Sequence, residues 1–403
     1  MSWEYVALGE LYEVHNGLSK GGKFFGKGSP FLSFSTVFNK WFLPQELLDL
    51  VQSTDNEQQS YSILRGDVFV TRTSETMDEL GMSSVALKDY PHATYNGFTK
   101  RLRPINPERI LPEFIGYYLR TAVFRAGFTA FSTMTTRASL RNEDLLSMKV
   151  PVPDMQTQKH IASILSAYDD LIENNQKQIK LLEEAAQRLY KEWFVDLCFP
   201  GHENVKITDG VPEGWHVVKL SDVADVNKTS ISKQYPYDYV DYVDLGSVSK
   251  GRIETITRFS IQETPGRAKR VASDGDIIWG MVRPNLKSYA LVFHPAATSV
   301  FSTGFAVLSA QKVPFSFLYC YVTQDDFVGY LVNCTNGAAY PAVKPIHFEK
   351  ATIMVPTDDL LKQFNLIAKP MYRKIEILEK QIQQAKESRD RLLPKLMSGE
   401  IEV

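Results

Sequence analysis

VPVPDMQTQKHIASIL, residues 150–165, contains two prolines, a short polar turn and then an apolar pattern with helical spacing. Such a stretch is typical of the end of one domain and the start of a long helix. MVPTDDLLKQFNLIAKPM, residues 354–371, repeats the pattern, and Pro153 matches Pro356 at a shift of 203 residues. A chain that leaves a domain twice in the same way is expected to contain two copies of one unit.

Further pairs of segments follow in the same order in both halves of the chain. They are WEYVALGELYEV (3–14) with WHVVKLSDVADV (215–226), RGDVFVTR (65–72) with DGDIIWGMVR (274–283), NGF (96–98) with TGF (303–305), and LPEFIGYYLRT (111–121) with VPFSFLYCYVT (313–323). Each pair alone is a weak signal, but the shared order indicates a duplication. The shift falls from 212 to 203 residues, as loops of different length would cause.

Each copy is expected to hold a mixed domain followed by a long helix. The boundaries place a first mixed domain at 1–153, a central helix and linker at 154–210, a second mixed domain at 211–356 and a C-terminal helix at 357–403. Short β runs at 62–71, 99–105, 275–282 and 304–309 precede helical segments at 112–126 and 316–331. Because no strand–helix–strand alternation is sustained, an α+β fold is favoured over a doubly wound α/β fold.

The two long helices carry a heptad pattern, with steps of four and three residues between apolar or small positions. The seam residues on which the prediction rests are Ile161, Leu165, Ile172, Asn175, Ile179, Leu182, Met371, Ile375, Leu378, Ile382 and Leu392. Two matching seams in one chain predict an antiparallel coiled coil if a pseudo-two-fold axis crosses the helices, with Asn175 fixing the register. We expect the second helix to start or kink at Pro370, and Pro394 to loosen its last turn. The alternative is that two ordinary amphipathic helices pack on their own domains.

Composition indicates an ordinary globular protein of the cytoplasm. Hydrophobic residues make up 44% and charged residues 23% of 403 residues, and the net charge is −2. The N-terminal segment has no apolar signal-peptide core, and no apolar run reaches the roughly 20 residues that a membrane span needs. The three cysteines form no C-x-x-C pair.

The residues above, together with the ending RDRLLPKLMSGEIEV (389–403), resemble the specificity subunit of type I restriction-modification systems. The shared features are the W-x-x-V-x-L opening, the G-D-[VI] strand, the VPVP exit followed by Gln158, and a leucine-leucine-proline run before Ser-Gly-Glu. The second exit departs from the pattern, because Gln363 comes two residues later after its proline, which would indicate a local insertion.

The resemblance implies a non-catalytic, DNA-binding subunit with two target recognition domains, each reading half of a bipartite double-stranded DNA site. Its helices would dock two modification subunits, which methylate adenine with S-adenosylmethionine, and restriction subunits would join to form an ATP-dependent nuclease. S-adenosylmethionine, ATP and Mg would then belong to the partner subunits, and this chain would hold no cofactor.

Charge patterning supports DNA binding locally rather than globally. In the two mixed domains, called the first and second head below, lysines and arginines balance acids, with 16 against 16 in 1–153 and 14 against 13 in 211–356. Strips without any acid nevertheless occur at 14–45, 114–142 and 277–324. Such strips can bind phosphates, or can simply be solvated faces. Side chains that can fork onto base edges, on loops after strands, are the best candidates for reading sequence. The candidate DNA-binding residues are Lys20, Lys23, Lys27, Arg72, Thr73, Ser74, Arg137, Arg141, Arg283, Asn285, Lys287, Tyr340 and Lys344.

Motifs for chemistry are weak. GGKFFGKGS (21–29) lacks the hydroxyl residue of a phosphate-binding loop and is better interpreted as a flexible basic loop near DNA. The histidines are dispersed, so we expect no metal site, and the acid pairs Asp169-Asp170 and Glu183-Glu184 are expected to face solvent or a partner. We therefore expect no catalytic residues. The alternatives are a self-sufficient DNA methyltransferase or nuclease, and a coiled-coil adaptor whose heads bind proteins.

Overall fold

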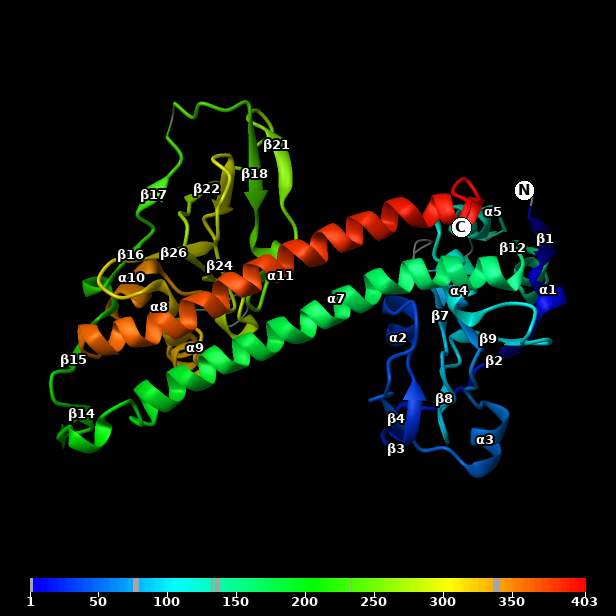
Figure 1. The fold of residues 1–403 in the computed structure, drawn as a ribbon, viewed down its shortest axis with the longest axis horizontal. Coiled ribbons are helices and arrows are strands. Elements are labelled where there is room, and N and C mark those ends of the chain that lie inside the picture. Colours follow the sequence, from blue (N-terminus) through cyan, green and yellow to red (C-terminus); the bar gives the residue numbers. More distant parts are fainter. Residues whose placement is uncertain (1–2, 75–79, 132, 135–137, 233, 336–340) are drawn as a thin grey trace. The chain divides into compact units, whose positions relative to one another are not determined.

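The computed structural model describes residues 3–74, 80–131, 133–134, 138–232, 234–335 and 341–403. The chain divides into two compact units, Met1–Asn174 with Ile382–Val403, and Asn175–Gln381. Each unit contains one globular head and a part of each of the two long helices, α7 (Met155–Tyr190) and α11 (Asp358–Ser398) (Figure 1).

The two long helices begin at matching positions of the repeat. Met155 and Asp358 are 203 residues apart, the same shift as the two prolines that precede them. Before α7, the carboxylate of Asp154 accepts hydrogen bonds from the backbone N–H of Gln156 at 2.9 Å and of Thr157 at 3.0 Å. These bonds satisfy N–H groups that the first turn of a helix leaves free. They also lower the pKa of Asp154, with the hydroxyl of Thr157 as the largest cause.

The expected insertion at the second exit is absent. Gln158 is buried and bonds two separate segments of the first head, donating to Pro153 O at 2.9 Å and accepting from Leu111 N at 2.7 Å. At the matching position of α11 stands Leu361, which is also buried, whereas Gln363 is exposed. The second copy has replaced the amide by an apolar side chain, so the glutamine in its sequence is not the counterpart of Gln158.

The second helix does not start at Pro370, one of the two outcomes expected there. α11 begins 12 residues before Pro370 and continues through Pro394 to Ser398. A proline inside a helix removes one backbone hydrogen bond and costs about 3 kcal/mol. The buried neighbours Phe364, Ala368 and Tyr372 pack on both sides of Pro370, and their burial offsets that loss.

Within each unit the two helices run antiparallel, as the repeat predicts. In the first unit Arg389 of α11 bonds Asp169 of α7, and Leu396 shares a core cluster with Ile161. In the second unit Asn175 Nδ2 donates to Gln381 Oε1 at 3.2 Å, and the rings of Tyr190 and Phe364 lie 6.2 Å apart. As the residue number rises along α7, the partner's number falls along α11.

The predicted seam is confirmed as the buried side of both helices. Buried seam residues are Ile161, Leu165, Ile172, Asn175, Ile179, Ile375, Leu378 and Ile382, and half-buried ones are Leu182, Met371 and Leu392. The alternative of two helices that each pack only on their own domain is therefore wrong.

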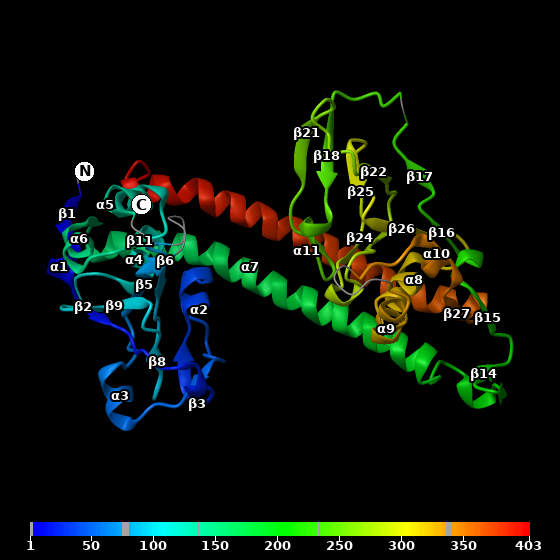
Figure 2. The same ribbon diagram turned by 180° about the vertical axis from the view of Figure 1, so that it is seen from behind.

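Each head is built on a four-stranded sheet of the same topology, which confirms the internal repeat and the mixed α+β fold. The first sheet has the order β2-β9-β5-β7, and the second has the order β16-β26-β23-β24. Figure 2 labels β2, β9 and β5 of the first sheet and β16, β26 and β24 of the second. Their strands are β2 (Tyr12–Asn16), β9 (Thr99–Pro104), β5 (Val68–Thr71) and β7 (Ser83–Val85), then β16 (Ala224–Val226), β26 (Phe305–Ala310), β23 (Ile277–Gly280) and β24 (Tyr289–Leu291).

The two sheets also share their register. Leu102 lies between Val14 and Val68 in the first, and Leu308 lies between Val226 and Ile277 in the second. Val14 and Val226 are partners in the sequence repeat as well, so strand pairing and sequence give the same correspondence. The paired strands can therefore be matched residue by residue, except at the end of β2, which is two residues longer than β16.

The structure shows why a Gly-Asp turn precedes both β5 and β23. Gly66 and Gly275 have φ of +90° and +85°, a backbone conformation that favours glycine. Asp67 is fully buried and accepts hydrogen bonds from Leu64 N at 2.8 Å and from the guanidinium of Arg103 at 2.6 and 2.8 Å. The turn thus fixes where the central strand of each head starts.

The heads differ outside this common sheet. In the first head β3 (Phe25–Leu32) joins β4 (Leu50–Val51) and β8 (Thr94–Tyr95) in a three-stranded sheet. In the second head a five-stranded sheet takes this place, with the order β17-β22-β25-β18-β21 over residues 229–302. Strands β1 (Glu4–Ala7) and β12 (Lys149–Val152) pair at the base of the first head, as β15 (His216–Lys219) and β27 (Thr352–Val355) do at the base of the second.

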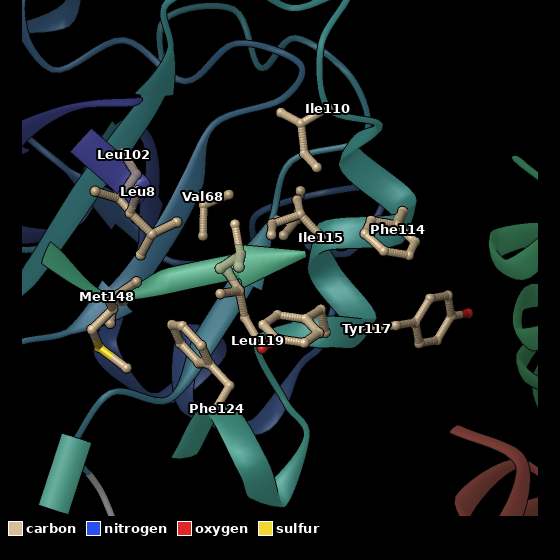
Figure 3. Close-up of a cluster of buried hydrophobic side chains, with 14 of the residues drawn as sticks. Leu8, Val68, Leu102, Ile110, Phe114, Ile115, Tyr117, Leu119, Phe124 and Met148 are labelled. Carbon is tan, nitrogen blue, oxygen red and sulfur yellow. The ribbon is translucent and has the colours of Figure 1, made fainter. Parts of the chain in front are cut away.

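The core of the first head connects its sheet to its helices. Val68 and Leu102 of the sheet pack with Phe114 and Ile115 of α4 (Pro112–Tyr118) in one buried cluster (Figure 3). Tyr117 extends away from the other labelled side chains, and its hydroxyl donates to Asp169 of α7 at 2.6 Å. The head is therefore attached to the helix by a polar contact as well as by apolar packing.

Candidate nucleic-acid interface

In the first head, strand pairing brings two of the predicted DNA-binding segments together. Arg72 follows β5, and the backbone of Thr73 and Ser74 forms β6, which pairs with β11 (Ala138–Ser139). The carbonyl of Arg72 accepts from Leu140 N at 3.0 Å. Arg141 is exposed directly beyond this point, and Arg137 lies outside the described residues.

The guanidinium of Arg72 is held at the end of the sheet, where its Nη1 donates to Asn16 Oδ1 at 3.1 Å. Asn16 is the last residue of β2. A guanidinium oriented on one edge keeps its remaining N–H donors for another acceptor.

The second head presents its candidate residues on a turn of unusual backbone. Arg283 and Lys287 have φ of +50° and +56°, and they flank a short 3-10 turn at Pro284–Leu286. Arg283 N donates to Pro341 O at 2.7 Å, which ties this turn to the segment of Lys344. The side chains of Arg283, Asn285 and Lys344 are exposed. Two non-glycine residues at positive φ cost about 1–3 kcal/mol each, a strain found at binding sites.

Two of the predicted DNA-binding residues of the second head are not among the exposed side chains that the structure describes. Lys287 is half-buried, and its Nζ bonds Asp325 at 2.6 Å, so an ion pair within the head already holds its charge. Tyr340 lies outside the described residues.

The sequence repeat aligns Arg72 with Arg283, but in the structure the two residues do not occupy equivalent positions and differ by two residues. Hydrogen bonding to the facing segment shows this, because Leu140 N donates to Arg72 O and Val343 N donates to Met281 O at 2.9 Å. Met281 is therefore the counterpart of Arg72, and Arg283 lies two residues further along the turn. The physical reason is the longer path from the Gly-Asp turn to the arginine in the second copy.

The segment with Lys20, Lys23 and Lys27 is not the flexible loop that its glycines predict. Gly22–Phe24 forms a 3-10 turn, and Phe25–Leu32 is strand β3. Lys20 Nζ bonds a carboxylate oxygen of Glu57 and the carbonyl of Gln52, both at 2.6 Å, whereas Lys23 and Lys27 are exposed. Only the last two leave their ammonium groups open to solvent.

Sequence reasoning missed three residues beside Arg72. Lys100 of β9 is only 4% exposed, and its ammonium donates to the side-chain oxygen of Asn142, the first residue of α6 (Asn142–Ser147). Burial, and then the positive charge of Arg72, lower the pKa of Lys100 to about 8. Together with Asn16, these residues place two cations and two amides at one end of the sheet. Only the spatial pairing of β2, β9 and α6 reveals this group.

The second head has a cleft of about 430 Å³ next to the turn at Pro284–Leu286. Val282, directly before Arg283, lines it together with Asp244, Arg267 and the aromatic rings of Tyr242 and Phe259. Cation, carboxylate and ring surfaces are the groups that contact base edges and sugar faces.

The acid pairs on α7 do not both face solvent as expected. Asp170 and Glu184 are exposed, but Asp169 is half-buried and bonded by Tyr117 and Arg389. Glu183 is half-buried, and burial raises its pKa. One acid of each pair therefore belongs to the junction between helix and head.

Within the described part of the chain, no group of three or more His, Cys, Asp and Glu side chains is placed to hold a metal ion. The helices of that part also lack any segment long and apolar enough to cross a membrane.

Comparison with known proteins agrees with this architecture. The family model for the type I restriction modification DNA specificity domain matches residues 1–184. The type I restriction enzyme MjaIX specificity subunit of Methanocaldococcus jannaschii is 27% identical, covering 79% of this chain and 75% of that protein. The putative type I restriction enzyme MjaX specificity subunit of the same organism is 23% identical, covering 100% and 94%.

A solved structure shares the fold. The crystal structure of the type I restriction-modification system S subunit from M. genitalium superimposes with a TM-score of 0.62, at 15% identity, covering 98% of this chain and 96% of that one.

Residues 1–184 thus resemble the DNA specificity domain of type I restriction-modification systems. Over most of its length the chain is similar to specificity subunits of type I restriction-modification systems, in agreement with the resemblance seen in its sequence.

Proposed function

We propose that this chain recognises a bipartite site in double-stranded DNA, with one head for each half of the site. The observation that carries the proposal is the repeated head itself, with one sheet order and one register in both copies. In each head a cation-bearing segment follows the central strand and is bonded to a second candidate segment. Duplication lets one chain do what a two-fold dimer does, while the heads diverge and read different sequences.

The chain acts without catalysis of its own and positions two modification subunits, with restriction subunits joining them. The outer faces of the long helices support this role, because they expose large apolar side chains that water does not favour. These are Leu171 and Leu181 on α7, and Leu366, Ile367 and Ile377 on α11. S-adenosylmethionine, ATP and Mg would bind the partner subunits, and the complex would work in the cytoplasm.

Selection from a random pool of duplex DNA by the full-length chain, with its modification subunits present, tests the proposal. The enriched sequences should contain two constant blocks separated by a spacer of fixed length. Affinity for them should fall steeply as salt rises, because phosphate contacts release counterions.

Two results would point elsewhere. An enriched pool without a split motif, and affinity without salt dependence, would favour a protein-binding adaptor. Transfer of labelled methyl groups to DNA by this chain alone would favour a self-sufficient methyltransferase.

A further inference from the structure

The end of the first head's sheet holds two cations on neighbouring strands. Lys100 of β9 pairs with Asn16 of β2 on one side and with Val70 of β5 on the other, and Arg72 lies two residues beyond Val70. Each cation is oriented by a neutral amide, Arg72 by Asn16 and Lys100 by Asn142. Because amides carry no charge, they fix the geometry of the cations without neutralising them.

No carboxylate lies within ion-pair distance of Arg72 or Lys100 among the residues that the structure describes. A buried ammonium without a counterion is unfavourable, and a second cation nearby makes it more so. The pKa of Lys100 reflects both effects, and the carboxylate of Asp144 opposes them only as a smaller influence. An anion from outside the chain would relieve this arrangement.

The second head shows that the fold does not require these cations. The shared register matches Lys100 to Ala306, which is fully buried, and Arg72 to Met281. Lys228 follows Val226 by two residues in the sequence, as Asn16 follows Val14, and its charge is balanced by Asp225 at 2.9 Å. The same strands therefore form a stable sheet with small or apolar residues at the two cation positions. The two cations are therefore not needed to form this sheet.

We propose that Arg72 and Lys100 together bind one phosphate group of the DNA backbone in the first half-site. This inference rests on the proposed function and assigns a role to two residues within it. A phosphate offers several acceptor oxygens, so it can accept from the guanidinium of Arg72 and from the ammonium of Lys100 at once. Lys100 is too deeply placed on its strand to reach into a groove, whereas a phosphate on the surface of the duplex can approach the end of the sheet. The pair would set the register of the first head on DNA rather than read a base.

Lys100→Ala in the full-length chain tests the inference, because alanine is the residue that the second head carries at this position. The probes are a mixed-sequence duplex of about 40 base pairs and the duplex selected by the unaltered chain, each titrated over a range of salt concentrations. The slope of log affinity against log salt should shrink by about 0.9, the value for one phosphate contact. At about 0.1 M salt, binding should weaken roughly eightfold on both duplexes. Lys88→Ala, which removes an exposed lysine of the same head, is the matched control and should leave the slope unchanged.

Each other outcome has a defined meaning. An unchanged slope in Lys100→Ala, with normal salt dependence of the unaltered chain, overturns the phosphate site and leaves the proposed function intact. Loss of discrimination in one half-site also overturns it, because that result identifies a base contact. If the unaltered chain shows neither salt dependence nor a selected sequence, the proposed function itself fails. Lys100→Met, which keeps the aliphatic stem, replaces the alanine variant if that variant melts at a lower temperature than the unaltered chain.

Discussion

Arg389 lies on α11 seven residues after Ile382 and three before Leu392, in step with the heptad seam, and the structure gives its replacement a definite effect. Its guanidinium bonds Asp169 of α7 at 2.6 Å and lies 4.8 Å from the ring centre of Trp41 in the first head. Asp169 in turn accepts the hydroxyl of Tyr117 at 2.6 Å. Arg389 therefore joins both long helices and the head of the first unit at one point.

Arg389→Met keeps the length and helix propensity of the side chain but removes its charge. A charge-assisted hydrogen bond in a mostly buried site contributes about 1.5–3 kcal/mol, and the contact with Trp41 adds about 0.5–1 kcal/mol. Better burial of the methionine offsets part of this loss, so we expect the free energy of unfolding to fall by about 2–3 kcal/mol. For a unit of about 200 residues, this lowers the melting temperature by about 4–12 °C.

Urea unfolding of Arg389→Met, Asp169→Asn and the double variant measures the interaction directly. The double variant should be less destabilised than the sum of the single changes by more than 1 kcal/mol or so, because both remove the same bond. Asp390→Asn is the control, since Asp390 also bonds Arg389 but is exposed, and it should cost no more than about 0.5 kcal/mol. Additive single changes would refute the role assigned to Arg389.

Arg283→Ala should reduce discrimination in one half of the DNA site by about 1–3 kcal/mol, measured by competition with single-base variants of the selected duplex; an equal loss on all sequences would make Arg283 a phosphate contact. Insertion of four residues next to Asn175, with four more next to its partner Gln381, adds about 6 Å of helix, and the selected spacer should lengthen by about two base pairs; an unchanged spacer would show that the helices do not set it. Lys100→Ala should stabilise the first head more at about pH 7 than at about pH 10. Because the pKa of Lys100 is lowered in the folded head, the unfolded chain binds more protons than the folded chain between about pH 8 and 10.5. The unaltered protein therefore gains stability as pH rises through that window, and the variant does not. Melting curves at both pH values give the comparison, and equal gains would contradict it.

The fold could be predicted from the sequence because its signals are periodic and repeated. The heptad seam identified both long helices, and the Gly-Asp turn identified the central strand of each head. These features are set by local backbone geometry and by the burial of one helix face, which a single sequence reports well.

Details that depend on tertiary packing could not be predicted. Pro370 reads as a helix boundary, but the packing of α11 overrides the loss of one hydrogen bond. Gln363 reads as the counterpart of Gln158, but Leu361 takes that place. In both cases the decisive contacts come from residues far away in the sequence.

The candidate site could be predicted only in part, because the sequence pattern shows the loops after strands but not the spatial neighbours of each side chain. Loops after the central strands were identified, but Lys100 reads as an ordinary strand residue until its neighbours on β2 and α6 are known. Lys20 reads as a free cation, although Glu57, on a separate helix, neutralises it. The sequence shows which charged residues the chain contains, whereas only the fold shows which of them have an ion-pair partner.

The two heads are attached to the helices by chemically different contacts at matching positions. In the first unit these positions hold Tyr117, Asp169 and Arg389, joined by hydrogen bonds at 2.6 Å. In the second unit the same positions hold Tyr319, Tyr372 and Ala186. There the two tyrosine rings pack edge to face with centroids 5.2 Å apart, and the Tyr372 hydroxyl contacts the Cys320 thiol at 3.0 Å.

An exchange of helix halves between the heads would mismatch these contacts. If the N-terminal halves of α7 and α11 were exchanged, the first head would lose the carboxylate that binds Tyr117, and Asp169 would enter the aromatic site of the second head without its arginine. A buried carboxylate without a partner is destabilised by several kcal/mol, which is more than most single contacts contribute. Divergence at the junctions thus makes each head specific for its own part of α7 and α11, so that a chain built from two similar copies still has one preferred pairing.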